Sequence, residues 1–184
     1  MSTIYDKAIQ IKCLTLDLDG VLTDGGLYLN DKGEESRRFN ITDGFGIKLL
    51  KALGFHVCII TGSNDAVVRQ RMHQLGIEHY YTKCIHKLEP YEDLKQKLNL
   101  EDHEIAFMGD DYQDIVLLKR VGLSFAPANA IDPVKNHVDI VTQARGGHGA
   151  VREISEFFIN LHNKSDEIIN YFNQYPCQEL DKVF

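Results

Sequence analysis

The stretch IKCLTLDLDGVLTD, residues 11–24, limits the possible folds of this chain more than any other segment. Its apolar side chains predict a buried strand, and two carboxylates, Asp17 and Asp19, stand at the C-terminal edge of that strand. Carboxylates in such a place are costly unless a cation or hydrogen-bond donors meet them. Gly20 then lets the backbone turn away into a polar loop. The segment therefore indicates a divalent cation held at the end of a strand.

Composition excludes several classes of protein. The 184 residues suit one domain of ordinary size, and 43% hydrophobic with 26% charged residues is typical of a globular protein. Because the formal net charge is -7 and no block of Lys and Arg occurs, we expect no nucleic-acid partner. No leader segment and no apolar run long enough to span a bilayer is found, so we expect a cytoplasmic protein without a membrane partner.

Apolar segments alternate with helical patterns along the rest of the chain. Turn-forming residues at 30–33 place a β-hairpin at 26–40. Further strands are expected at 55–60, 80–82, 105–108, 123–126 and 139–141, and helices at 45–53, 65–75, 89–98, 115–121 and 151–161. This order predicts an α/β fold with a doubly wound, Rossmann-like parallel sheet, helices on both faces and a hairpin flap.

Parallel sheets of this kind bind ligands at the carboxyl ends of their strands. Asp110 follows an expected strand at this edge, where a cation held by Asp17 would need another oxygen ligand. Mg²⁺ suits a site with few carboxylates, several waters and a phosphate. The polar residues expected to converge on this rim are Asp17, Asp19, Thr61, Gly62, Asp110, Asp111 and Asp114.

Several of these residues also have a simpler interpretation. Asp111 and Asp114 fit an N-cap and dipole partner for the helix that follows them. Thr61 and Gly62 fit an ordinary strand-to-helix turn as well as a site for phosphate oxygens at a helix N-terminus. Lys87 fits a solvated surface lysine as well as a cation that balances the acidic rim and a phosphate. The residues alone leave both interpretations open.

Four motifs occur in order: DLDGVLTDG at 17–25, ITG at 60–62, Lys87, and GDDYQD at 109–114. In order and spacing they resemble the haloacid dehalogenase superfamily of phosphohydrolases. The resemblance covers nearly the whole chain and implies one domain over 1–184, with the hairpin flap at 26–40 and a C-terminal tail at 165–184. Segments that look like the capless branch, typified by 3-deoxy-D-manno-octulosonate 8-phosphate (KDO 8-phosphate) phosphatase, are GEE at 33–35, FNITDGFGI at 39–47 and GGHGAVRE at 146–153.

The resemblance implies a Mg²⁺-dependent phosphomonoester hydrolase that works through an aspartyl phosphate. Asp17 would attack phosphorus, and Asp19 would protonate the leaving oxygen and then deprotonate the attacking water. The metal would be bound by Asp17, the backbone carbonyl of Asp19, and Asp110. The residues implied to hold the phosphate are Thr61, Gly62 and Lys87, and those implied to hold metal waters or Lys87 are Asp111 and Asp114.

The resemblance also implies a substrate, KDO 8-phosphate, which would be hydrolysed to KDO and phosphate in lipopolysaccharide precursor synthesis. Relatives usually carry arginine where this chain has Ser63 and His148. Both differences are expected to remove cationic reach, that is, a guanidinium group that could contact the sugar acid. The phosphatase of a nonulosonate 9-phosphate is therefore an alternative. The residues implied to contact the substrate are Asn40, Ile41, Thr42, Asp43, Gly44, Lys48, Ser63 and Arg71.

Two alternatives come from other classes of protein. A response-regulator receiver also combines acidic residues, Thr or Ser, and Lys on a doubly wound sheet. Its phosphorylated aspartate ends a middle strand, which in this chain ends in Thr61. A non-catalytic oligomerisation domain of the same fold is the second alternative, but such domains tend to lose the acid/base aspartate. Because Asp19 is present, the sequence favours an enzyme.

The hairpin and the tail predict an assembly. Leu27, Leu29 and Phe39 are more apolar residues than an isolated two-stranded ribbon can bury, and its edges invite other strands. The tail, residues 166–184, adds apolar side chains that one subunit's core does not need. We therefore expect a homotetramer in which hairpins pair across subunits and a neighbouring chain covers each site. For the final residues, a frayed tail is the alternative.

Overall fold

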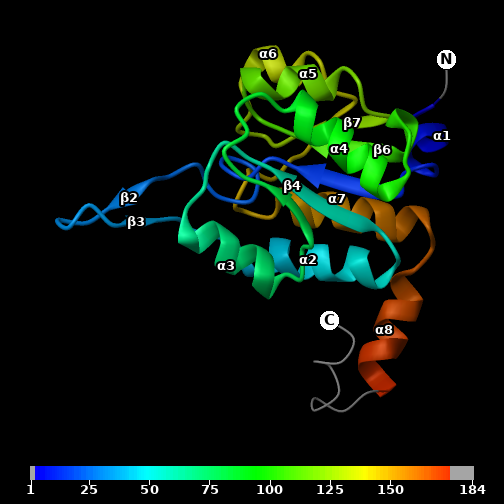
Figure 1. The fold of residues 1–184 in the computed structure, drawn as a ribbon. Coiled ribbons are helices and arrows are strands. Elements are labelled where there is room, and N and C mark those ends of the chain that lie inside the picture. Colours follow the sequence, from blue (N-terminus) through cyan, green and yellow to red (C-terminus); the bar gives the residue numbers. More distant parts are fainter. Residues whose placement is uncertain (1–2, 175–184) are drawn as a thin grey trace.

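A six-stranded parallel sheet runs through the centre of the computed structural model, which describes residues 3–174 (Figure 1). Its strands are β1 (Cys13–Leu16), β4 (His56–Ile60), β5 (His79–Tyr81), β6 (Ile105–Met108), β7 (Leu123–Ala126) and β8 (Ile140–Val141). Their order across the sheet is β5-β4-β1-β6-β7-β8, and every neighbouring pair is parallel. The predicted doubly wound sheet is therefore confirmed.

Helices pack on both faces of this sheet (Figure 1). One face carries α2 (Ile41–Ala52), α3 (Ala66–Gln74) and α7 (Ala150–Leu161), and the other carries α4 (Leu88–Leu98), α5 (Ile115–Leu118) and α6 (Asp132–Lys135). Successive side chains of a strand point to opposite faces, so β1 sends Leu14 and Leu16 into one core and Cys13 into the other. Among the helices of residues 3–174, none combines the length and apolar character that crossing a membrane needs.

The path of the chain creates a switch point beside β1. After β1 the chain moves to β4 and β5 on one side, and it then returns to β6, β7 and β8 on the other side. At the carboxyl ends of β1 and β6 the two connections therefore lead in opposite directions, which opens a crevice in sheets of this type. Asp17 follows β1 and Asp110 follows β6 at this crevice.

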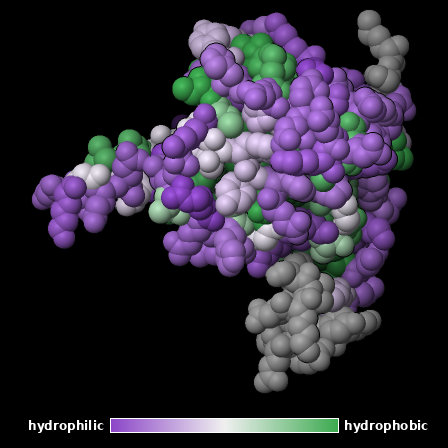
Figure 2. Space-filling model, in the orientation of Figure 1, coloured by the Kyte–Doolittle hydropathy of each residue, from purple (hydrophilic) through white to green (hydrophobic). Residues whose placement is uncertain are grey.

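The predicted hairpin is present and projects from the body of the molecule (Figure 1). It consists of the antiparallel strands β2 (Tyr28–Leu29) and β3 (Glu35–Ser36). Leu27 and Leu29 are 53% and 64% exposed, and Figure 2 shows hydrophobic surface on this projecting arm. In the part of the chain that the structure describes, only this hairpin is inserted between β1 and α2, so the predicted absence of a cap domain is confirmed.

Some helix boundaries differ from the prediction. Helix α2 begins at Ile41, before the predicted start, because Asn40 acts as its N-cap and accepts the Thr42 N–H at 2.7 Å. Helix α8 (Ser165–Gln174) makes the first part of the tail helical. The remainder of the tail prediction, residues 175–184, lies outside the described residues. Helices α1 (Ile4–Ala8) and α6 were not predicted because they are too short to show a helical period.

Candidate active site

Asp17 lies directly after β1, and its side chain is buried against a lysine. Asp17 Oδ1 is 2.8 Å from Lys87 Nζ. Lys87 occupies the N-cap position of α4, has a fully buried side chain, and also lies 2.5 Å from Asp114 Oδ1. A buried ammonium with two carboxylate partners is not a solvated surface lysine, so that simpler interpretation is wrong. Lys87 instead supplies positive charge at the predicted rim.

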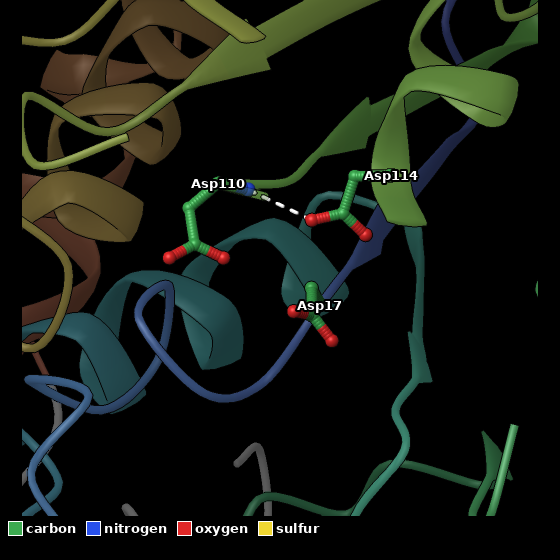
Figure 3. Close-up of side chains that lie close together, drawn as sticks. All are labelled: Asp17, Asp110 and Asp114. Carbon is green, nitrogen blue, oxygen red and sulfur yellow. Dashed lines mark hydrogen bonds between the residues drawn. The ribbon is translucent and has the colours of Figure 1, made fainter. Parts of the chain in front are cut away.

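Three carboxylates, those of Asp17, Asp110 and Asp114, lie close together at this edge of the sheet (Figure 3). Each of Asp17, Asp110 and Asp114 offers one oxygen, and these oxygens lie within 4.8 Å of one another. Asp114 ends a short 3-10 helix, η2 (Tyr112–Asp114). Its Oδ2 accepts the backbone N–H of Asp110 at 2.9 Å and that of Asp111 at 3.1 Å. Asp114 therefore pairs with Lys87 and also shapes the loop that presents Asp110.

The charges of this cluster do not balance. Burial raises the pKa of Asp17 to about 6, although the charge of Lys87 opposes this shift. Burial, together with the negative charges of Asp17, Asp114 and Asp111, raises the pKa of Asp110 to about 7. A divalent cation would remove the repulsion that contributes to these shifts. Carboxylate oxygens are ligands that hard divalent cations prefer, so the cluster fits the predicted metal site.

Gly20 makes room for this site. Its φ of +82° favours glycine, and a Cβ at this position would lie 2.0 Å from Asp110 Oδ2. Asn129 Nδ2 donates to the Gly20 carbonyl at 2.9 Å, and Asn129 Oδ1 accepts the Gly146 N–H at 2.6 Å. Asn129 thus ties the loop after β1 to the loop before α7. The sequence analysis did not identify Asn129, because it lies outside the four motifs and does not directly follow an expected strand.

The side chain of Asp19 has a different set of partners from Asp17. Arg37 Nε donates to Asp19 Oδ1 at 2.9 Å, and Ser63 Oγ donates to Asp19 Oδ2 at 2.5 Å. The metal contact predicted for Asp19 used its backbone carbonyl and stays a prediction. Arg37, directly after β3, was missed by the sequence analysis. The signal for it is the adjacent pair Arg37 and Arg38 on a chain segment that returns toward an acidic rim.

The remaining rim residues lie at the expected strand ends. Thr61 follows β4, is buried, and its Oγ1 accepts the Ser63 N–H at 3.1 Å, whereas Gly62 is exposed. Asp111 is exposed and caps η2 by accepting the Tyr112 N–H at 2.7 Å. The simple capping interpretation therefore holds for Asp111. The phosphate contacts of Thr61 and Gly62, and a role of Asp111 toward metal waters, stay predictions.

The segment predicted to face the substrate also joins α2 to α7. Asp43 is fully buried, and its carboxylate accepts the N–H groups of Gly149 at 3.1 Å and Arg152 at 2.8 Å. These bonds show that Asp43 caps the start of α7, and its predicted contact with the substrate stays a prediction. Arg71 lies beside this segment, since its Nη2 donates to the Asn40 carbonyl at 3.3 Å. For Ile41, Thr42, Gly44, Lys48 and Arg71 the substrate contacts stay predictions.

The expected loss of cationic reach at Ser63 and His148 stays a prediction, but each of these two residues has an arginine of the hairpin segment beside it. Arg37 Nη2 donates to Ser63 Oγ at 3.2 Å. Arg38 Nη1 lies 2.8 Å from His148 Nε2. Both positions therefore have a guanidinium beside them, supplied from a different part of the chain. The spacing of motifs along the sequence does not reveal this, because the hairpin must fold back before these side chains meet.

Comparisons with known proteins agree with this architecture. A family model described as haloacid dehalogenase-like hydrolase matches residues 81–154, which include Lys87, Asp110 and Asp114. The 3-deoxy-D-manno-octulosonate 8-phosphate phosphatase KdsC of Escherichia coli strain K12 is 40% identical over 164 residues, which cover 89% of this chain and 87% of the relative.

Solved structures give the same result. The Moraxella catarrhalis 3-deoxy-D-manno-octulosonate 8-phosphate phosphatase, in complex with magnesium, phosphate and KDO, matches with a TM-score of 0.88 and 36% identity, over 92% of this chain and 97% of that chain. The cobalt-bound deoxy-D-mannose-octulosonate 8-phosphate phosphatase of Haemophilus influenzae matches with a TM-score of 0.83 and 36% identity, over 86% and 93% of the two chains.

The fold and the site define a phosphohydrolase of the doubly wound type, and the chain belongs to the haloacid dehalogenase-like hydrolases. Relatives that match most of its length include 3-deoxy-D-manno-octulosonate 8-phosphate phosphatases. The predicted family and the predicted phosphatase class are therefore confirmed, and the receiver-domain alternative is wrong.

Proposed function

We propose that this phosphatase hydrolyses KDO 8-phosphate to KDO and inorganic phosphate, as a step of lipopolysaccharide precursor synthesis. The observation that carries the proposal is the arrangement of Asp17, Lys87 and Asp110 at the switch point of the sheet, with Asp17 Oδ1 2.8 Å from Lys87 Nζ. The substrate comes from the relatives, which carry this activity in their names and match most of the chain.

Asp17 acts as the nucleophile in this proposal. One of its carboxylate oxygens forms a bond to phosphorus while the bond from phosphorus to the ester oxygen breaks, which gives an aspartyl phosphate. Burial lowers the pKa of Lys87, but the negative charges of Asp17 and Asp114 raise it above the usual value. This ammonium therefore stays protonated. Its charge reduces the repulsion between the carboxylate and the incoming phosphate.

Asp19 acts as the acid and then as the base. Its proton moves to the ester oxygen as that oxygen leaves, and the carboxylate then takes a proton from the water that attacks the aspartyl phosphate. The bond between phosphorus and Asp17 breaks in this second step, and Asp17 returns to its starting form. Thr61, Gly62 and Lys87 are proposed to hold the equatorial phosphate oxygens, since they lie at the same edge of the sheet.

The proposed metal is Mg²⁺, held by Asp17, Asp110 and the carbonyl of Asp19. When bound it supplies positive charge that polarises the phosphoryl group and relieves the repulsion among the carboxylates. Asp114 keeps the loop of Asp110 in place through the amides of Asp110 and Asp111. Gly20 leaves the space that the Asp110 carboxylate occupies.

A panel of sugar phosphates tests the proposal. Phosphate release would be measured from KDO 8-phosphate, from nonulosonate 9-phosphates and from simple hexose phosphates, each with Mg²⁺ and with excess chelator. We expect the highest kcat/KM for KDO 8-phosphate and no turnover in chelator. A preference for a nonulosonate 9-phosphate would support the alternative substrate. A strong preference for a hexose phosphate would refute both substrate assignments.

A further inference from the structure

Arg37 is held at the site although the hairpin strand before it is exposed. Its side chain is only 9% exposed, whereas both residues of β3 are exposed. The guanidinium contacts three residues in two other segments of the chain. Nε donates to Asp19 Oδ1 at 2.9 Å, Nη2 donates to Ser63 Oγ at 3.2 Å, and Nη1 pairs with the Asp65 carboxylate. One side chain therefore connects the hairpin to the loop after β1 and to the start of α3.

The contact with Asp65 replaces a local interaction. Asp65 is the N-cap residue of α3 and has the extended backbone that this position requires, yet its side chain makes no capping hydrogen bond. An aspartate at an N-cap normally accepts a backbone N–H of the first helical turn. Here the carboxylate pairs with Arg37 instead. The guanidinium is thus bound firmly enough to redirect a side chain from its usual partner.

The contacts with Asp19 fix the direction of its carboxylate. Oδ1 accepts from Arg37 Nε and, at 3.3 Å, from Thr23 Oγ1, while Oδ2 accepts from Ser63 Oγ. Both oxygens are therefore engaged, and the side chain is held by donors from three directions. A group that transfers a proton must present its oxygen in a defined direction, and loss of that direction lowers the rate even when the group itself is retained.

We propose that Arg37 is a positioning residue for Asp19. The inference rests on the proposed acid and base role of Asp19 and adds the residue that orients it. Arg37 neither gives nor takes a proton. It holds the Asp19 carboxylate against Ser63 and Thr23, and the same guanidinium draws the base of the hairpin onto the mouth of the site. One side chain therefore orients the proposed acid and base and fixes the base of the hairpin.

The test uses Arg37→Met and Arg37→Lys in the full chain with Mg²⁺ present. The matched control is Arg120→Met, because Arg120 also pairs with two carboxylates, Glu92 and Asp102. Asp102 begins the short helix before β6, at the opposite edge of the sheet from the site. Thermal unfolding and elution volume would show that each variant is folded and assembled like the unmodified chain.

Single-turnover rates would be compared for KDO 8-phosphate and for p-nitrophenyl phosphate, whose leaving group needs little protonation. We expect Arg37→Met to lower the rate with the sugar phosphate by about 10- to 100-fold, and the rate with p-nitrophenyl phosphate much less. In steady-state measurements, Arg37→Met should change kcat more than KM. Arg37→Lys should recover part of the rate with the sugar phosphate. Arg120→Met should leave the rates with both substrates unchanged.

A double-mutant cycle separates this inference from the proposed function. In an Asp19→Asn background, Arg37→Met should cause no further loss with the sugar phosphate. Additive losses, equal losses on both substrates, or a rise in KM alone would overturn the positioning role while leaving Asp19 as the acid and base. Full activity of Asp19→Asn itself would overturn the proposed role of Asp19, and the inference with it.

Discussion

The carboxylate rim and the hairpin lie at the same site but are held in opposite ways. The rim consists of Asp17, Asp110, Asp114 and Lys87, which are positioned by the ends of central strands and by backbone amides. The hairpin, residues 26–40, is a two-stranded ribbon with exposed strands. Its Arg37 side chain reaches Asp19, in the loop that follows Asp17.

This difference assigns different tasks to the two regions. The rim stores unfavourable electrostatic energy, seen in the raised pKa values of Asp17 and Asp110, because burial and like charges are imposed by the sheet. The strands of the hairpin bury little, and the buried side chain of Arg37 anchors its base. Changes in the rim should therefore abolish chemistry or lower stability, and changes in the exposed strands of the hairpin should alter assembly and access to the site.

The largest expected effect belongs to Asp17. Asp17→Asn should lower phosphate release by about ten-thousandfold or more, because asparagine is isosteric but is not a nucleophile of this kind. Thermal unfolding should show an intact fold. A variant that keeps more than about a hundredth of the turnover would contradict the nucleophile assignment.

The next largest effect is on stability. Lys87→Met removes the buried cation between Asp17 and Asp114 and should lower the free energy of unfolding by about 3 to 5 kcal/mol. The matched control is Lys12→Met, whose exposed pair with Glu104 should contribute at most about 1 kcal/mol. Denaturant titrations of the two variants measure both values. Equal losses would show that Lys87 is not held by buried charges.

A smaller effect is expected from pH. Because the pKa of Asp110 is raised to about 7 in the folded chain from 3.8, the folded state holds a proton that the unfolded state has already released between these values. Stability of the metal-free protein should therefore fall as pH rises through about 4 to 7. Mg²⁺ needs the ionised carboxylate, so its stabilising effect should grow over the same window.

Thermal unfolding with and without Mg²⁺, at matched ionic strength from pH 5 to pH 8, measures this dependence. Asp110→Asn serves as the control and should weaken this dependence, leaving the part that the raised pKa of Asp17 contributes. An increase in melting temperature with Mg²⁺ that is the same at both ends of the range would show that Asp110 does not exchange its proton for the metal.

The smallest effect on the fold itself is expected in the hairpin. Leu27→Lys with Leu29→Lys should change the unfolding free energy of one subunit by no more than about 0.5 kcal/mol, because both side chains are already exposed. The same pair should break the proposed homotetramer, which light scattering measures. Ile9→Lys, at another exposed apolar position, is the control and should leave the assembly intact. A fully active monomer of the unmodified chain would refute the proposed assembly.

Much of the rim could be predicted from the sequence because each residue follows a strand. Asp17 and Asp110 end adjacent strands, and parallel strands bring their carboxyl ends to one edge. The burial of Lys87 was harder to predict, because it depends on how α4 packs beside the rim. Local pattern gives the strand ends, whereas the depth of a side chain depends on the whole fold.

The contacts of Arg37 and Asp43 could not be predicted in this way. Arg37 reaches Asp65, 28 residues away, and Asp43 accepts from Arg152, 109 residues away. Neither pairing follows from periodicity or from spacing within a motif. The N-cap signal at Asp65 predicts a local hydrogen bond, and the structure shows that a tertiary ion pair has displaced it.

The central claim is that Asp17 carries the phosphoryl group during turnover. Rapid quenching of the enzyme with KDO 8-phosphate, borohydride reduction and peptide mass spectrometry tests it most directly. We expect homoserine at position 17, formed by reduction of the aspartyl phosphate, and no such product in Asp17→Asn. Reduction product at another aspartate, with position 17 unchanged during active turnover, would contradict the account.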